Sequence, residues 1–209
     1  GSASGPATRA HFGDRLAAAI AARESQIVVG IDPDPAHLWP DALDHTSEAR
    51  AALAQALAAA HESARAIAAG ELAASEAAIG ADLAVQPAAL EAGAAVLAHA
   101  IALIDAAAPA CVAAKPQLAC FERLGFAGAL ALEATVARAR AAGLLVLADG
   151  KRGDVPVTAA AYGQALTGST PSPFGGVPGL GVDALTANPL LGRDAVAPLV
   201  ADARSAGAG

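Results

Sequence analysis

The sequence predicts an α/β protein built on a parallel sheet, and three observations lead to this prediction. Short apolar runs with the character of buried strands alternate with longer alanine-rich stretches of helical periodicity. Glycine or proline separates many of these runs from the helices. Charged residues follow three of the apolar runs, and polar groups gather in this way at the carboxyl edge of a parallel sheet, where the sites of α/β proteins lie.

Four apolar runs are predicted as strands. They cover residues 27–31, 111–114, 144–148 and 182–187, and they end at Asp32-Pro33, Lys115-Pro116, Asp149 and Asn188-Pro189 respectively. The runs are short and largely apolar, which is typical of strands covered by helices on either side.

Helices are expected before and between these strands. The predicted helices are residues 12–23, a long alanine-rich helix capped by Thr46 or Ser47 and running toward Ala69, and residues 87–107, 128–142 and 155–166. Pro109 closes the third and Gly143 ends the fourth. The Gly-, Pro- and Ser-rich segment 167–181 is expected to be a loop.

The chain has 209 residues, which is enough for one sizeable core. Residues 1–10 are expected to be a flexible addition, in which Gly1-Ser2 looks like a cloning remnant, and residues 11–209 are expected to form a single domain. Only four strands fit, whereas an eight-stranded barrel typically needs about 250 residues. The residues alone therefore leave two possibilities open, an open α/β sheet or part of a barrel.

Composition excludes several classes of function. A net charge of −7 with scattered arginines argues against a nucleic-acid partner. Polar residues or glycines interrupt every alanine-rich stretch, so no membrane span is expected. The start of the chain has no signal-peptide pattern, so a cytoplasmic location is expected by default. Cys111 and Cys120 have no metal-ligand spacing and are expected to be buried thiols.

The chain contains only two lysines, Lys115 and Lys151, and otherwise carries its positive charge on arginine. A lysine ammonium is compact and can give up a proton, whereas an arginine guanidinium in practice cannot. Two isolated lysines are therefore candidates for a chemical role, although a general drift toward arginine would leave the same pattern.

The most informative stretch runs from residue 144 to residue 158. Residues two apart on a strand point the same way, so Asp149 and Lys151 are expected to form an ion pair. Asp154 is expected at the start of the next helix, with Thr158 one turn later on the same face. A simple salt bridge and a simple helix cap would explain these residues too, but the expected convergence with Lys115 and Asp32 favours a site.

The same residues carry a resemblance to a known family. The segment Ala-Asp149-Gly-Lys151-Arg-Gly-Asp154, followed by Thr158, resembles the Asp-x-Lys-Arg-x-Asp signature of the orotidine 5′-phosphate decarboxylases. Further matches to the bacterial branch of that family are Ile31-Asp32-Pro33, Lys115-Pro116-Gln117 with Phe121-Glu122, and Thr186-x-Asn188-Pro189 with Leu191-Gly192. The matches run in the family's order from about residue 12 to residue 199.

The resemblance implies a (β/α)8 TIM barrel of which this chain holds about the first four βα units. It implies decarboxylation of orotidine 5′-monophosphate to UMP in pyrimidine biosynthesis, without a metal or organic cofactor. Lys115, Asp149, Lys151 and Asp154 would form an alternating catalytic array, in which Lys151 stabilises and protonates the C6 carbanion. Asp32 and Lys115 would hold the ribose of the nucleotide substrate within one subunit. Asp154 and Thr158 would reach across a homodimer interface to ribose hydroxyls in the neighbouring subunit's site.

Two alternatives stay open. A related enzyme could act on a 3-keto sugar phosphate with magnesium, since Asp-x-Lys-x-x-Asp also occurs there. A half-barrel could also serve as a non-catalytic assembly or binding subunit, because no segment matches the family's phosphate-binding and pyrimidine-binding loops. Arg193 and Arg204 lie in no phosphate motif and are interpreted as solvated charges, and residues 41–109 have no functional interpretation.

Overall fold

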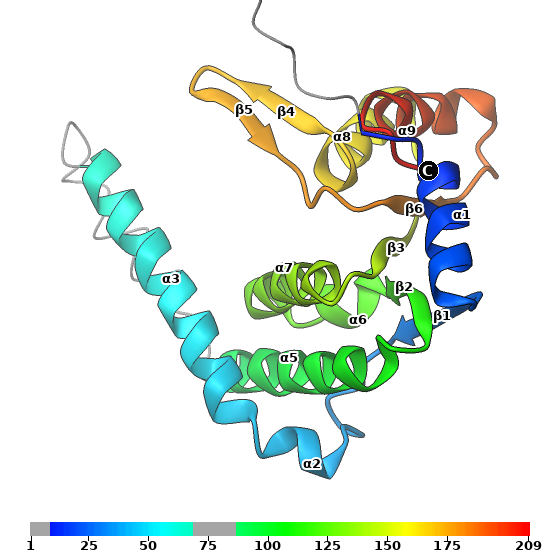
Figure 1. The fold of residues 1–209 in the computed structure, drawn as a ribbon. Coiled ribbons are helices and arrows are strands. Elements are labelled where there is room, and N and C mark those ends of the chain that lie inside the picture. The colour runs from blue at the N-terminus through cyan, green and yellow to red at the C-terminus, as the bar shows by residue number, and fades with distance from the viewer. Residues whose placement is uncertain (1–8, 69–86) are drawn as a thin grey trace, which may run out of the picture. The chain divides into compact units, whose positions relative to one another are not determined.

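The computed structural model of the chain describes residues 9–68 and 87–209 (Figure 1). Its contacts divide the chain into two compact units. Unit 1 contains residues 1–32, 103–119 and 136–209, and unit 2 contains residues 33–102 and 120–135. Two helices, α5 (Pro87–Ala107) and α7 (Gly125–Ala141), run from one unit into the other along the chain.

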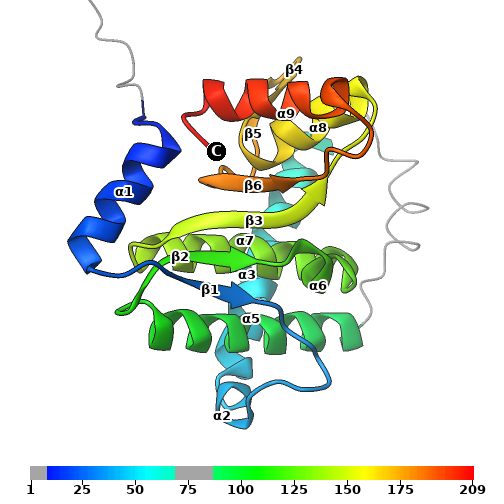
Figure 2. The same ribbon diagram turned by 90° about the vertical axis from the view of Figure 1, so that its right-hand side faces the viewer.

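A parallel sheet forms the centre of unit 1. Among the described residues it contains β1 (Ile27–Ile31), β2 (Cys111–Pro116), β3 (Leu145–Arg152) and β6 (Ala184–Ala187), in the order β1-β2-β3-β6 (Figure 2). Each strand pairs with the strand that precedes it in this series. A doubly wound sheet reverses its order at a switch point, whereas a (β/α) barrel keeps it, so this is the strand order of part of a barrel.

Burial follows the place of each strand in the sheet. The inner strands β2 and β3 carry fully buried residues, among them Ala113, Val146 and Ala148. The edge strand β1 leaves Ile27 59% exposed and Val28 40% exposed. The prediction of buried strands therefore holds for β2 and β3 and for Ile31 at the carboxyl end of β1, which is fully buried, and fails at the amino end of β1.

The opposite edge of the sheet is partly occupied. The N–H of Gly209 donates to the carbonyl of Asp183, and the N–H of Leu185 donates to the carbonyl of Gly209, both at 3.0 Å. In a parallel sheet, a residue donates its N–H to one residue of the neighbouring strand and accepts from the residue two positions further on, which is the pattern that Gly209 makes with Asp183 and Leu185. Gly209 thus lies where a strand next to β6 would lie.

The remaining elements of unit 1 are α1 (Phe12–Arg23), α8 (Pro156–Leu166), α9 (Arg193–Ser205) and a hairpin of β4 (Ser169–Ser172) and β5 (Gly175–Pro178). The hairpin corrects the prediction of an irregular loop over 167–181. Serine, proline and glycine are depleted in strands, so the pattern gave no strand signal. The turn is made possible by Gly175, whose φ of +110° suits glycine.

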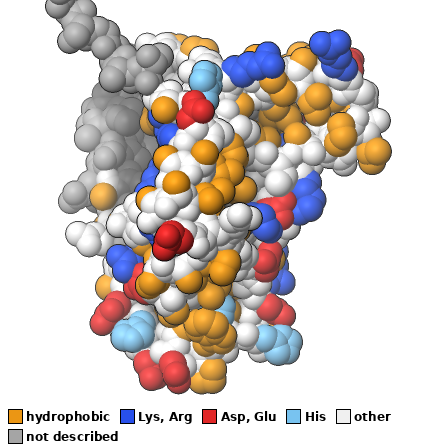
Figure 3. All heavy atoms as spheres, turned by 45° about the vertical axis from the view of Figure 1, so that its right-hand side comes forward, with side chains coloured by type: hydrophobic (Ala, Val, Ile, Leu, Met, Phe, Trp, Pro, Cys, Tyr) orange, Lys and Arg blue, Asp and Glu red, His pale blue; other side chains and the backbone are white. Residues whose placement is uncertain are grey.

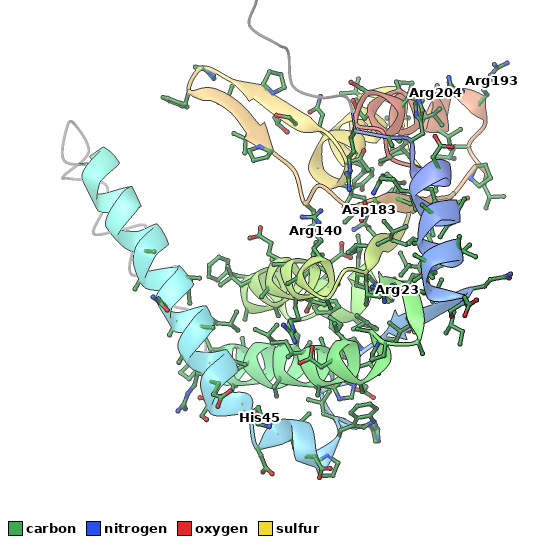
Figure 4. The ribbon with its side chains drawn as sticks, viewed as in Figure 1. Arg23, His45, Arg140, Asp183, Arg193 and Arg204 are labelled. Atoms are coloured by element: carbon green, nitrogen blue, oxygen red, sulfur yellow. The ribbon has the colours of Figure 1, made fainter. Side chains whose placement is uncertain are left out.

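Arginines fix the amino end of the sheet in unit 1 (Figure 4). Asp183 is buried, accepts the Val146 N–H at 2.8 Å, and is paired with Arg9 and Arg15. Arg23 of α1 donates to the carbonyl of Cys111 at 2.6 Å, where β2 begins. Several of the scattered arginines thus have a structural role. On the face drawn in Figure 3, the Lys and Arg side chains form separate blue spots.

Unit 2 consists of helices. It contains α2 (Pro40–Leu43), α3 (Thr46–Ala68), α6 (Leu118–Glu122, from Cys120 on) and the adjoining parts of α5 and α7. A Cβ on Gly93 would lie 2.9 Å from the Ala127 Cβ, so α5 and α7 approach closely there. The predicted cap of α3 is wrong for Thr46, which is the first helical residue and whose buried hydroxyl has no hydrogen-bond partner among the described residues.

The expectation that no stretch of the chain is long and apolar enough to span a membrane needs correction for one helix, and the expectation of two buried thiols needs correction for one cysteine. Helix α5 is long and apolar enough to cross a membrane by length and composition alone, with a mean hydropathy of 1.7 over its best 18-residue window. Core helices pass the same test, and 39% of that window is buried. Of the two expected buried thiols, Cys111 is buried and Cys120 is only partly so.

Candidate active site

The candidate site lies at the carboxyl ends of the strands in unit 1. Lys115 is near the end of β2, and Asp149 and Lys151 are near the end of β3. The strand β3 continues to Arg152, three residues beyond the predicted end at Asp149. The prediction that these groups meet at one edge of a parallel sheet is confirmed for Lys115, Asp149 and Lys151.

Asp149 is the centre of this cluster. Its side chain is only 8% exposed, and its two oxygens accept four hydrogen bonds from side chains. Oδ1 accepts from the Lys151 Nζ at 2.7 Å and from the Thr186 Oγ1 at 2.8 Å. Oδ2 accepts from the Lys115 Nζ at 2.9 Å and from the Gln117 Nε2 at 3.1 Å. Each oxygen therefore has one ammonium donor and one neutral donor.

This environment keeps Asp149 ionised. The hydrogen bond from Lys151, followed by that from Lys115, holds the pKa of Asp149 far below its usual range, and the Thr186 hydroxyl acts in the same direction. Burial opposes them, since it disfavours a charged carboxylate. The two flanking ammonium groups thus favour the charged form of this aspartate.

The backbone around Asp149 departs from a regular strand. Ala148 pairs with Leu185 and Arg152 pairs with Ala187, so three residues of β3 face the single residue Thr186 of β6. Lys151 has a φ of +47°, a left-handed conformation that is uncommon for residues other than glycine. The predicted ion pair is confirmed, but a bulge brings Lys151 to Asp149 in place of the predicted regular alternation along a strand.

The two lysines differ in their access to solvent. The Lys115 side chain is 33% exposed and the Lys151 side chain is 62% exposed, although both ammonium groups contact Asp149. The Lys151 ammonium is thus bound to Asp149 while more than half of its side chain is exposed. A ligand reaching this edge of the sheet can contact it.

The other predicted site residues are not joined to this cluster by any contact that the structure records among the described residues. Asp32 directly follows β1 and is exposed. Asp154 accepts the Val155 N–H at 2.7 Å and lies before the N-cap of α8, which is Val155. Asp154 is therefore neither the helix cap nor on the helical face of Thr158, and Thr158 is half-buried within α8. Among the described residues, contacts thus join three of the four predicted members of the array, Lys115, Asp149 and Lys151, within one chain.

Two residues of the cluster were not among the predicted site residues. Gln117 follows β2 directly, and Thr186 lies within β6. Gln117 belongs to the Lys-Pro-Gln motif and Thr186 to the Thr-x-Asn-Pro motif, so a signal for each was present in the sequence. Neither residue carries a charge that would point to a site, and the sequence alone does not show that β2 and β6 flank β3.

Comparison with known proteins assigns the chain to a family. Residues 25–209 match the model of the orotidine 5′-phosphate decarboxylase / HUMPS family. The chain belongs to this family.

Curated relatives support the decarboxylase branch of the orotidine 5′-phosphate decarboxylase / HUMPS family. The orotidine 5′-phosphate decarboxylase of Deinococcus radiodurans is 47% identical over 105 residues, which are 50% of this chain and 35% of the relative. That of Rhodopirellula baltica is 46% identical over 110 residues, 50% of this chain and 34% of the relative. The aligned part of the chain thus spans about a third of the length of these relatives.

Solved structures of the family share the fold. A Streptomyces avermitilis protein named provisionally as an orotidine 5′-phosphate decarboxylase is 30% identical with a TM-score of 0.63, covering 100% of this chain and 54% of that one. The Leishmania donovani OMP decarboxylase is 22% identical with a TM-score of 0.53, covering 91% and 49%, and it shows the fold alone. The predicted (β/α) architecture is therefore confirmed.

The two arginines interpreted as solvated charges, Arg193 and Arg204, are exposed on α9 as expected (Figure 4).

Proposed function

We propose that the protein carrying this chain decarboxylates orotidine 5′-monophosphate to UMP in pyrimidine biosynthesis. The observation that carries the proposal is the buried Asp149 carboxylate held between the ammonium groups of Lys115 and Lys151 at 2.9 and 2.7 Å. Membership of the orotidine 5′-phosphate decarboxylase / HUMPS family and the curated decarboxylase relatives support it.

The reaction explains the need for this cluster. Loss of CO2 from C6 of the pyrimidine leaves an electron pair in the ring plane, with no adjacent π-system to absorb it, so a preorganised charge next to C6 is required. In the proposal Lys151 supplies this positive charge and then donates a proton to C6. Its exposed side chain and its fixed ammonium fit both tasks.

Asp149 has a different task in the proposal. It faces the carboxylate of the substrate, and two such charges about 4 Å apart repel by about 4 kcal/mol at an effective dielectric constant of about 20. The repulsion requires Asp149 to stay ionised beside the substrate. Its four donors serve this purpose, because they occupy the lone pairs at which a proton would bind.

The test is an assay of decarboxylation by the loss of absorbance as orotidine monophosphate becomes UMP. We expect turnover by the protein carrying this chain and loss of nearly all of it in Lys151→Ala. Arg193→Ala, which removes an exposed cation from α9, is the control and should keep wild-type turnover. Unchanged turnover in Lys151→Ala would exclude the proposed role of this lysine.

Metal dependence and partner binding, each measured separately, distinguish the two alternatives. An enzyme acting on a 3-keto sugar phosphate with magnesium would lose activity on chelation, whereas the proposed decarboxylase would keep it. A non-catalytic assembly subunit would bind a partner chain and turn over no nucleotide. The Lys-Pro-Gln and Asn-Pro motifs and the decarboxylase relatives favour the nucleotide enzyme.

The proposal includes a cytoplasmic homodimer in which Asp154 and Thr158 contact the ribose in the neighbouring subunit's site. Asp32 and Lys115 hold the ribose from within the same subunit. Two features support the shared site. Asp154 makes no recorded contact with the Asp149 cluster of its own chain in the described part of the structure. Val155 and Val157, beside it, are 59% and 84% exposed, as apolar residues are before an interface covers them.

A further inference from the structure

Thr186 lies opposite the irregular part of β3. Residues 149–151 bulge away from regular pairing with β6, and Thr186 is the single residue of β6 that faces them, while Asp149 makes a parallel bridge with Gln117 on the other side. A bulge interrupts the ladder of backbone hydrogen bonds and turns side chains in a new direction. The backbone groups within it need other partners to hold one conformation.

The Thr186 hydroxyl supplies such a partner and joins both ends of the bulge. The Lys151 N–H donates to the Thr186 Oγ1 at 2.9 Å, and the Thr186 hydroxyl donates to the Asp149 Oδ1 at 2.8 Å. The directions are fixed by chemistry, because a backbone N–H only donates and an ionised carboxylate only accepts. The hydroxyl therefore links the Lys151 backbone to the Asp149 side chain through two consecutive hydrogen bonds.

This link matters because Lys151 is poorly constrained elsewhere. Its φ of +47° is a conformation that persists only where the surroundings enforce it. Its side chain is 62% exposed, so packing does little to fix its flexible stem. Gln117, in contrast, donates to the other oxygen of Asp149 and has no recorded bond to Lys151 among the described residues.

We propose that Thr186 is a positioning residue, whose hydroxyl holds the β3 bulge so that the Lys151 ammonium and the Asp149 carboxylate keep the separation that decarboxylation needs. The proposal rests on the proposed function of the Lys115–Asp149–Lys151 cluster. Thr186 acts through its two neighbours and needs no contact with the substrate.

The experiment compares Thr186→Val with Thr186→Ser in the protein carrying this chain. Valine keeps the shape and the strand preference of threonine but has no hydroxyl, and serine keeps the hydroxyl. Displacement of a catalytic group by about 1 Å can cost 100-fold in rate. We expect kcat to fall by about 10- to 100-fold in Thr186→Val with little change in KM, and to recover to within a few-fold in Thr186→Ser.

Thr135→Val is the matched control for the loss of a buried hydroxyl. Thr135 is 0% exposed and its hydroxyl donates to the Ala131 carbonyl at 2.7 Å, within one helix. The Thr135→Val variant should keep wild-type kcat. Wild-type kcat in Thr186→Val, or an equal loss in Thr186→Ser, would overturn the proposal.

A second measurement distinguishes failure of this inference from failure of the proposed function. Amide hydrogen exchange at Lys151 and the carboxyl titration of Asp149 can be followed by NMR whether or not the protein turns over nucleotide. Thr186→Val should speed exchange of the Lys151 N–H and raise the pKa of Asp149. If neither changes, Thr186 does not position the pair, even if the wild-type protein is an active decarboxylase.

Discussion

At the scale of single residues, the environment of Asp149 determines how stability depends on pH. An aspartate in an unfolded chain titrates near pH 4, and the lysine donors lower the pKa of Asp149 in the folded chain. The ionised form therefore stabilises the fold. This contribution is complete above about pH 5 and is lost as the pH falls toward the lowered pKa of the folded state.

The corresponding prediction concerns Asp149→Asn. The substitution leaves two ammonium groups around an amide, and we expect it to lower the free energy of unfolding by about 1–3 kcal/mol at pH 7. The difference from wild type should be smaller at pH 3, because wild-type Asp149 has then lost part of its contribution. Urea unfolding at the two pH values measures both quantities.

The control for this prediction is Asp105→Asn. Asp105 is paired with Arg138, and both side chains are 42% exposed, so the loss should stay within about 1 kcal/mol. An equal effect of Asp149→Asn at both pH values would show that its charge is not what stabilises the fold.

At the scale of elements, the turn from β3 into α8 is fixed by its contact with the end of β6. The Asn188 N–H donates to the Arg152 carbonyl at 2.7 Å, and a Cβ on Gly153 would lie 2.2 Å from the Asn188 carbonyl oxygen. The second glycine of the Asp-Gly-Lys-Arg-Gly-Asp motif is thus required by a close backbone approach. This contact places Asp154 relative to the cluster.

We therefore expect Gly153→Ala to destabilise the protein by about 1–3 kcal/mol, since the turn and the strand end must move apart. Decarboxylation should fall with it, because Asp154 moves with the turn. Gly13→Ala is the control: no atom lies within 4 Å of its added Cβ, and alanine suits a helix better by up to about 1 kcal/mol. In thermal unfolding, Gly153→Ala should lower the melting temperature relative to wild type, and Gly13→Ala should raise it slightly. Equal melting temperatures in the two variants would contradict the steric explanation.

At the scale of the whole molecule, the proposed dimer makes each site depend on two chains. In the proposed dimer, Lys151→Ala would damage the site of its own subunit, whereas Asp154→Asn would damage the site of its neighbour. A dimer formed from one chain of each variant retains one intact site. Random mixing of two inactive variants should then restore roughly a quarter of wild-type activity.

This prediction is tested by unfolding and refolding the two variants together and measuring turnover. A mixture of Lys151→Ala with Asp149→Ala is the control and should stay inactive, because both changes affect the same site. Mixed dimers of Lys151→Ala and Asp154→Asn that form but stay inactive would show that Asp154 serves its own subunit.

Much of the fold and part of the site were predictable from the sequence. The bounds of α1, β1 and α5 were predicted as the structure has them, because apolar periodicity, glycine and proline mark them directly. The cluster of Lys115, Asp149 and Lys151 was predictable because parallel strands bring their carboxyl ends to one edge. The β4–β5 hairpin and the capping of α3 were not, since their residues carry weak or misleading local preferences.

The sequence by itself determined the α/β class, the family motifs and the charged residues of the candidate site, since these depend on residue type and spacing along one chain. Tertiary structure decided which neutral residues complete the site. Thr186 and Gln117 reach Asp149 only because β6 and β2 lie on either side of β3, and Lys151 reaches it through a bulge. Strand neighbours and backbone bulges are set by packing between distant segments, and no local pattern records them.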